Sequence, residues 1–243
     1  MFKKSKVKNF SFLIILSFLI TNNSFADFKE IKKKATVTQP EIIFPIQKGK
    51  KGCIKDLYIS PDENYVLPVL KVEAPSGYGL DNRFDHANSK FADFSFPCGS
   101  GNVEACQNVK RVILKWAKAN AAQRTGPSDG EGRHWNDTLT VNLYTASPMM
   151  AAYSFAKQVI DVSEAEDKII KDWFKKIVKK NEHLMYKYSN YKSGSGATGT
   201  PKRAHNHALS SAMSHMQLGI LLKDDKLFRT AFKNFEAAVK YQR

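Results

Sequence analysis

The segment SEAEDKIIKDWFKKIV, residues 163–178, decides the fold class of this 243-residue chain. Ser163 followed by Glu166 is a capping-box pattern, which is typical of the first turn of an α-helix. The apolar residues after it recur with a period near 3.6, which gives a helix one apolar face; they are Ile169, Ile170, Trp173, Phe174, Ile177 and Val178. The segment therefore predicts an amphipathic helix, which we expect to run over residues 163–188.

Helical patterns continue on both sides of this segment. Other helices are predicted from about Val109 onward and over residues 137–159, 206–222 and 225–241. Pro148 is expected to kink or interrupt the second of these, because proline has no N–H to donate. Consecutive antiparallel helices form hairpins, and hairpins stack into bundles, solenoids or α/α toroids. The sequence thus predicts a mostly α fold.

The first 108 residues have a different character. Residues 27–50 are polar and Lys-rich, and residues 51–108 are rich in Gly, Pro, Asn, Asp and Ser without a helical period. We therefore expect an irregular N-terminal arm over residues 27–108 and a helical domain over residues 109–243. The final helix has no following partner for its apolar face, which predicts a domain truncated at its C-terminus.

The N-terminus has the three-part layout of a cleavable signal peptide. Four lysines precede an apolar run of 11 residues, 10–20, and Ser24 and Ala26 place small residues at positions −3 and −1 of a cleavage site. A membrane span needs about 20 residues, so the run is too short to be one. We expect removal of residues 1–26, no membrane span in the mature chain, and a periplasmic location.

The chain is strongly basic. Its formal net charge is +15, of which the four lysines of residues 1–26 contribute four, leaving +11 for the mature part. Such a surface favours an anionic partner. Export argues against nucleic acid, which leaves acidic glycans and anionic membrane surfaces, unless the charge serves solubility alone.

The cysteines number three, and an exported compartment permits disulfides. Cys98 and Cys106 are separated by a Gly-rich stretch, so we predict that they pair and leave Cys53 unpaired. No cysteine or histidine spacing indicates a zinc site, and no Walker loop, dinucleotide fingerprint or Gly-x-Ser-x-Gly motif occurs. We therefore expect no metal and no cofactor.

A cluster of polar side chains at the predicted start of the 206–222 helix is the first candidate site. Arg203, His205, Asn206 and His207 lie there. Free backbone N–H groups and the helix dipole attract a carboxylate to such a position. Asn206 can donate its amide, and His207 can donate or accept a proton. Alternatively, Asn206 only caps the helix.

A second cluster precedes the helix predicted over residues 137–159. Arg133 can pair with a carboxylate, and Trp135 can stack on a sugar ring. An ordinary helix cap would use the same residues. His215, two turns after His207, is predicted to pack inside the fold.

Three stretches of the chain resemble the alginate lyase superfamily: Trp-Phe-Lys-Lys-Ile at 173–177, His-Asn-His-Ala at 205–208, and residues 219–228. The chain is most similar to periplasmic poly(mannuronate) lyases, in which such a helix leads through a loop to Asn-Asn-His and a long helix. The resemblance covers about residues 109–243. It implies an α/α toroid, incomplete here, with a cleft for an acidic polysaccharide that is cleaved by β-elimination.

The resemblance also implies roles for single residues. Asn206 would neutralise the uronate carboxylate and so acidify the C5 proton, and His207 would share that task or act as the base. The substrate-binding candidates are Arg203, His205, Arg133, Trp135 and Tyr144, the last standing where the family has a Trp. The family's proton-donating Tyr lies in a Tyr-His-Asn-Tyr-like motif, which is expected beyond the end of this sequence.

We therefore predict a periplasmic polysaccharide lyase acting on alginate or a related polyuronate, with no nucleic-acid partner and with its oligomeric state open. Besides Tyr144, other family features differ here: His205 replaces an Asn, Ala208-Leu209 replaces an aromatic pair, and Ser89-Lys90-Phe91 corresponds to a Ser-Lys-Tyr element. These replacements favour the alternative, a non-catalytic exported protein of the same fold that binds an acidic glycan. A helical scaffold for a protein partner is the third hypothesis, and it predicts no glycan affinity.

Overall fold

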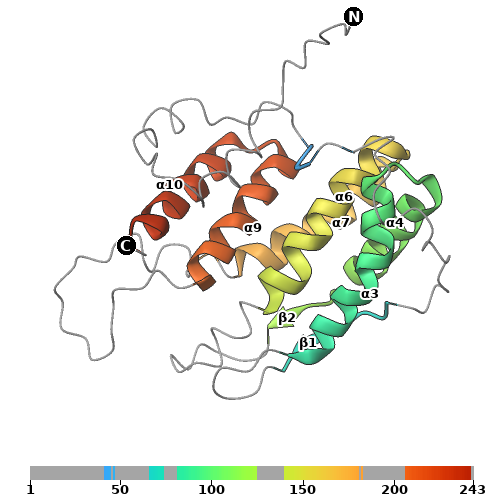
Figure 1. Cartoon of the computed structure of the whole chain (residues 1–243), viewed down its shortest axis with the longest axis horizontal. Coiled ribbons are helices and arrows are strands. Elements are labelled where there is room, and N and C mark those ends of the chain that lie inside the picture. The colour runs from blue at the N-terminus through green and yellow to red at the C-terminus, as the bar shows by residue number, and fades with distance from the viewer. Residues whose placement is uncertain are drawn as a thin grey trace, which may run out of the picture. The chain divides into compact units, whose positions relative to one another are not determined.

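A computed structural model gives the fold of the chain (Figure 1). The residues that it describes are 41–44, 46, 66–73, 81–124, 140–180, 182 and 206–241. All of them belong to the second of the two units into which the chain divides, residues 36–243. The predicted signal peptide and Cys53 lie outside the described residues.

The described part is mostly helical, as expected, and its long helices follow one another in pairs (Figure 1). The pairs are α3 (Asn82–Gly99) with α4 (Val103–Lys118), α6 (Ser147–Val159) with α7 (Glu164–Lys179), and α9 (Asn206–Leu222) with α10 (Asp225–Tyr241). A π-helix, η2 (Asn142–Ala146), leads directly into α6. Strands β1 (Lys71–Val72) and β2 (Gln123–Arg124) pair in parallel. The helices predicted over 206–222 and 225–241 are confirmed.

Helix α3 corrects the expectation of an irregular arm up to residue 108. Its buried residues recur at helical spacing, and they are Phe84, Ala87, Phe91, Phe94, Pro97 and Cys98. Asn, Asp and Ser residues stand between them and hide the period in the sequence. The side chain of Asp81 caps the helix by accepting a hydrogen bond from the Arg83 N–H at 3.1 Å. The arm prediction is wrong for residues 82–99 and, because α4 begins at Val103, for residues 103–108.

The interruption expected at Pro148 is the π-helix η2. Proline cannot donate to the carbonyl four residues earlier, so an α-helical ladder is broken just before it. The Ser147 N–H instead donates to the carbonyl of Asn142, five residues back, which is the π-helical pattern. The helical segment therefore continues from residue 140 to residue 159 with one wider turn inside it.

Helix α7 begins as the sequence predicted. Ser163 and Glu166 form a full capping box, in which each side chain bonds to the other residue's backbone N–H. Lys110 near the start of α4 forms an ion pair with Glu166 at 3.2 Å. Just beyond the end of α4, the Ala121 carbonyl accepts a hydrogen bond from the indole of Trp173 at 3.0 Å. Helices α4 and α7 therefore run parallel.

Helices α6 and α9 also run parallel. The hydroxyls of Ser147 at the start of α6 and Ser214 in the middle of α9 lie 3.0 Å apart. Near the other ends of both helices, Glu41 donates its backbone N–H to the Ile220 carbonyl and pairs with Lys157 at 3.0 Å. The two helices therefore begin at one end of the fold and finish at the other.

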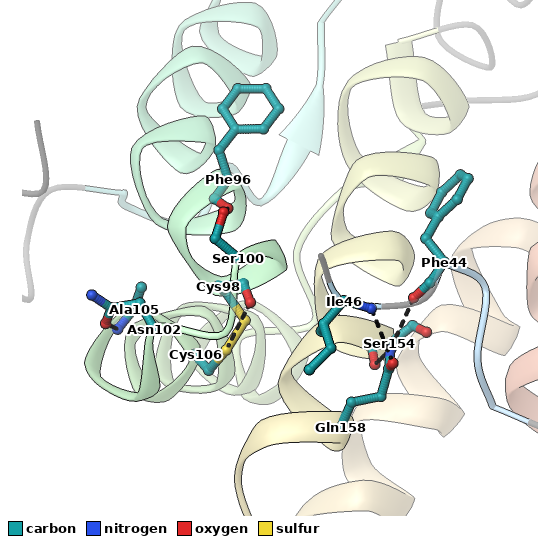
Figure 2. The surroundings of a disulfide bond; sticks show 10 residues. All are labelled: Phe44, Ile46, Phe96, Cys98, Ser100, Asn102, Ala105, Cys106, Ser154 and Gln158. Carbon is teal, nitrogen blue, oxygen red and sulfur yellow. Dashed lines mark hydrogen bonds between the residues drawn. A yellow bond between two sulfur atoms is a disulfide. The ribbon is translucent and has the colours of Figure 1, made fainter. Parts of the chain in front are cut away.

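A short strap, residues 41–44 and 46, lies across the ends of α6 and α9 (Figure 2). The Ile43 N–H donates to Ser154 Oγ at 2.7 Å, and Ser154 Oγ donates to the Glu41 carbonyl at 2.9 Å. Gln158 Nε2 donates to the Phe44 carbonyl at 2.8 Å. The strap is thus held through its backbone, mainly by α6.

The disulfide between Cys98 and Cys106 is confirmed, and it joins the end of α3 to the first turns of α4 (Figure 2). A Cβ on Gly99 would lie 3.1 Å from the ring of Phe155. That ring lies 6.2 Å from the ring of Phe44 in the strap. The disulfide turn and the strap therefore lie at the same end of the helices, which we call the strap end.

Carboxylates at the strap end are paired with cations. Asp167 accepts from the Tyr153 hydroxyl at 2.6 Å and pairs with Lys157 at 2.9 Å and Lys171 at 2.8 Å. Lys171 and Lys157 also pair with Glu41. Burial opposes ionisation, but these hydrogen bonds and charges hold the pKa of Asp167 and of Glu41 below their ordinary values. The strap is therefore fixed by charge as well as by backbone hydrogen bonds.

In the described part of the chain, no helix is long and apolar enough to cross a membrane.

Candidate functional site

The end opposite the strap gathers the start of α3, the π-helix η2, the start of α9 and the ends of α4 and α7. We call it the site end. The Asp81 N–H at the start of α3 donates to Thr140 Oγ1, just before η2, at 3.4 Å. Asn142 lies five residues before Ser147, and Asn206 lies eight residues before Ser214. Since a helix rises 1.5 Å per residue, η2 and the first turn of α9 lie on the same side of the Ser147–Ser214 contact.

Helix polarity makes the site end positive. The starts of α3 and α9 both lie there, and a helix start carries a partial positive charge. The ends of α4 and α7 carry the opposite partial charge, but their last turns hold Lys115, Lys118, Lys176 and Lys179. An anion that approaches this end therefore meets the N-terminus of α9 and these lysines, whereas the start of α3 already holds the carboxylates of Asp81 and Asp85.

Three of the predicted site residues are brought to the site end. Asn206 and His207 begin α9, as the sequence predicted, although their side chains lie outside the described set. Tyr144 lies in η2 and packs, partly buried, against the core. The remaining substrate-binding candidates fall outside the residues that the structure describes; they are Arg203, His205, Arg133 and Trp135.

Behind the first turn of α9, the interior of the helix is polar. Its buried polar residues include Ser210, Ser211, Ser214 and His215. Ser214 Oγ donates to the Ser210 carbonyl at 3.0 Å and also contacts the Ser147 hydroxyl. A polar layer therefore separates the start of α9 from the apolar core around Leu218 and Leu221.

His215 is fully buried in this layer, which confirms its predicted place inside the fold. Its Nδ1 lies 2.7 Å from the Ser211 carbonyl, and since a carbonyl can only accept, Nδ1 carries the proton. Burial lowers the pKa of the imidazole, and this effect outweighs the hydrogen bond to the Ser211 carbonyl and the charge of Glu182, which both raise it. His215 is therefore neutral, and its Nε2 is an acceptor with no hydrogen-bond partner among the described residues.

Asn142 and Thr145 add further polar groups from η2. Both are 0% exposed, and neither side chain has a hydrogen-bond partner in the described part of the chain. A buried polar group without a partner costs free energy, and π-helical turns occur frequently at functional sites. Sequence reasoning missed both residues, because only the proline that follows them signals an irregular turn.

No group of three or more His, Cys, Asp or Glu side chains that could hold a metal ion occurs within the described residues.

The family model described as Alginate lyase matches residues 100–243. This chain belongs to the alginate lyase family. No curated protein and no solved structure matches it. The matched region of this alginate lyase family member contains η2 and helices α4, α6, α7, α9 and α10, and therefore most of the site end. Helix α3 and the strap precede the match.

Proposed function

We propose that the protein is a polysaccharide lyase that cleaves alginate or a related polyuronate by β-elimination. Membership of the alginate lyase family supports this class of reaction. The observation that carries the choice of site is the position of Asn206 and His207 in the first turn of α9, at the positive end of the fold. The predicted signal peptide supports a periplasmic location for this activity.

Substrate binding begins with the uronate carboxylate. The start of α9 offers backbone N–H groups that have no partner within the helix, and the helix dipole favours a negative charge there. The Asn206 amide donates a further hydrogen bond to the carboxylate. These donors withdraw negative charge from the carboxylate and make the adjacent C5 proton more acidic.

The elimination then proceeds at C5 and C4 of the uronate. His207, as neutral imidazole, accepts the C5 proton. The electron pair of the C5–H bond forms the C4–C5 double bond, and the C4–O bond of the glycosidic linkage breaks. The leaving oxygen keeps the electron pair of the broken C4–O bond and takes up a proton from the solvent. The products are a new reducing end and an unsaturated sugar.

The experiment compares His207→Ala with His86→Ala, which changes an exposed histidine on α3. Production of the unsaturated sugar from polymannuronate is followed by ultraviolet absorbance, and binding of the polymer is measured alongside. We expect His207→Ala to lose at least about a hundredfold in turnover and to keep binding, since general-base catalysis contributes that much. His86→Ala should match the unaltered chain.

Two results would contradict the proposal. Polymer binding without unsaturated product from the unaltered chain would favour the non-catalytic acidic-glycan-binding protein. No affinity for any polyuronate would favour the helical scaffold with a protein partner.

A further inference from the structure

Lysines accumulate without acids on the last turns of the neighbouring helices α4 and α7. Lys115 and Lys118 lie at the end of α4, and Lys175, Lys176 and Lys179 lie at the end of α7; all five are exposed. We call these five residues the lysine surface. Neither helix has an acidic residue after Glu104 in α4 and Asp172 in α7.

The first halves of the same helices are charge-balanced. Lys110 pairs with Glu166, Lys168 pairs with Asp172, and Lys171 pairs with Asp167. By contrast, no ion pair of the lysine surface is found among the described residues, where the next acid along the chain is Glu182, three residues after Lys179. The sequence thus pairs its cations at one end of α4 and α7 and leaves them in excess over acids at the other.

Part of the lysine surface is held in place without being neutralised. Lys176 Nζ donates to the Asn120 side-chain oxygen at 2.7 Å, which fixes the ammonium against an uncharged group. Within each helix, the spacing of Lys115 and Lys118, and of Lys175 and Lys179, places neighbouring side chains on one face. Because α4 and α7 run parallel, the two pairs form one broad surface.

This surface lies at the same end of the helices as the candidate catalytic turn. Lys179 and Glu182 are both close enough to His215 for their charges to affect the pKa of that imidazole, Glu182 raising it and Lys179 lowering it, and His215 lies two turns along α9 from His207. A long chain of carboxylates bound at the start of α9 can therefore continue over the ends of α7 and α4.

We propose that the lysine surface binds the extended part of an acidic polysaccharide, beyond the sugars at the candidate catalytic turn, and so makes the protein prefer long polyuronates to short ones. The proposal rests on the proposed function only for the class of substrate. Lysines in the last turn of a helix also favour its dipole, but that effect acts on stability and not on binding.

The test compares two double variants that remove equal charge. Lys175→Gln with Lys179→Gln alters the lysine surface, and Lys226→Gln with Lys233→Gln alters two exposed lysines of α10. Binding of long polymannuronate, of a mannuronate trimer and of vesicles containing anionic phospholipid is measured at low and high salt. A Lys115→Gln, Lys118→Gln pair extends the test to α4.

We expect the α7 pair to weaken binding of the long polymer at least about fivefold at low salt, with a smaller effect on the trimer, because exposed charges act over about one Debye length. The difference should shrink at high salt. Equal losses in the α7 and α10 pairs, or vesicle binding without polymer binding, would overturn the proposal. The measured quantity is affinity, which is independent of turnover. If the chain makes no unsaturated product but the α7 pair still weakens polymer binding more than the α10 pair, the lyase proposal is contradicted and the lysine-surface proposal is supported.

Discussion

Buried polar groups have partners at the strap end of the helices, whereas several at the site end lack them among the described residues. At the strap end, Asp167 and Glu41 are matched to lysines, a tyrosine hydroxyl and backbone groups. At the site end, Asn142, Thr145 and the Nε2 of His215 are buried without a partner in the described residues. Burying unpaired polar groups lowers stability, and such groups concentrate at functional sites. The difference separates a part that holds the fold from a part arranged for binding.

Removing the centre of the strap-end network should give the largest loss. Asp167→Ala leaves the Tyr153 hydroxyl, Lys157 and Lys171 without their shared carboxylate. We expect the free energy of unfolding to fall by roughly 3 kcal/mol, because the partners of the removed carboxylate stay partly buried without a counter-charge. Chemical denaturation measures this change.

The control for that variant is Asp172→Ala, which breaks the exposed pair with Lys168. It should cost less than about 0.5 kcal/mol. Equal losses in the two variants would remove the distinction between the strap-end network and ordinary surface pairs.

Contact between α9 and α10 is the next place to break the strap end. A Cβ on Gly219 would lie 2.8 Å from the backbone nitrogen of Phe228, and a backbone atom cannot move aside cheaply. Gly219→Ala should lower the free energy of unfolding by about 2 kcal/mol, since overpacking outweighs the gain in helix propensity. Thermal unfolding of the purified variant measures this change. A variant as stable as the unaltered chain would show that α9 and α10 can move apart at this contact without cost.

Acid should act on the strap end through the same carboxylates. The pKa of Asp167 and of Glu41 is lowered in the folded chain, so the unfolded chain binds more protons near the ordinary values of about 4. The stability they contribute is present above those values and is lost as the pH falls through the lowered ones. The denaturant concentration at the unfolding midpoint should therefore decrease when the pH is lowered below about 4. The decrease should be smaller in Asp167→Ala.

At the site end, an apolar replacement should stabilise the protein. Asn142→Leu removes a buried amide that has no described partner, so we expect a gain of about 1 kcal/mol. The matched control is Asn108→Leu, because buried Asn108 accepts a hydrogen bond from Arg111 and should lose about as much. A loss in Asn142→Leu would show that this amide is satisfied and would weaken the contrast between the two ends.

The smallest effect is expected at the end of α9. Lys223 adopts a left-handed conformation with φ of 57°, and its N–H and that of Asp224 bond back to Ile220 and Gly219 in a Schellman motif. Glycine adopts this conformation without strain. Lys223→Gly should raise the free energy of unfolding by about 0.5 kcal/mol, measured by chemical denaturation. A loss of stability would mean that the 3.9 Å pair of Lys223 with Glu41 stabilises the fold by more than the relief of backbone strain does.

Local patterns were predicted well from the sequence, and distant contacts were not. The capping box of α7, the start of α9 at Asn206 and the Cys98–Cys106 bridge each depend on residues close together in the chain. The strap was missed because its partner Ser154 lies 113 residues from Glu41. Helix α3 was missed because polar residues conceal its apolar face.

For the candidate site, the sequence located the helix start that carries Asn206 and His207 but not the polar layer behind it. That layer depends on η2 and α9 lying side by side, which no local pattern records. Tyr144 was assigned from its position in the family pattern, and the structure places it at the same end as the start of α9.

The strap also imposes an order on folding. Glu41 leaves the ribosome long before Lys171, 130 residues later, and Ile220 comes later still. The strap therefore cannot form its backbone hydrogen bonds until α6, α7 and the end of α9 have been synthesised. Because closing such long loops is slow, docking of the strap should be a late step, and the first-made segment of the folded unit becomes one of its last to settle.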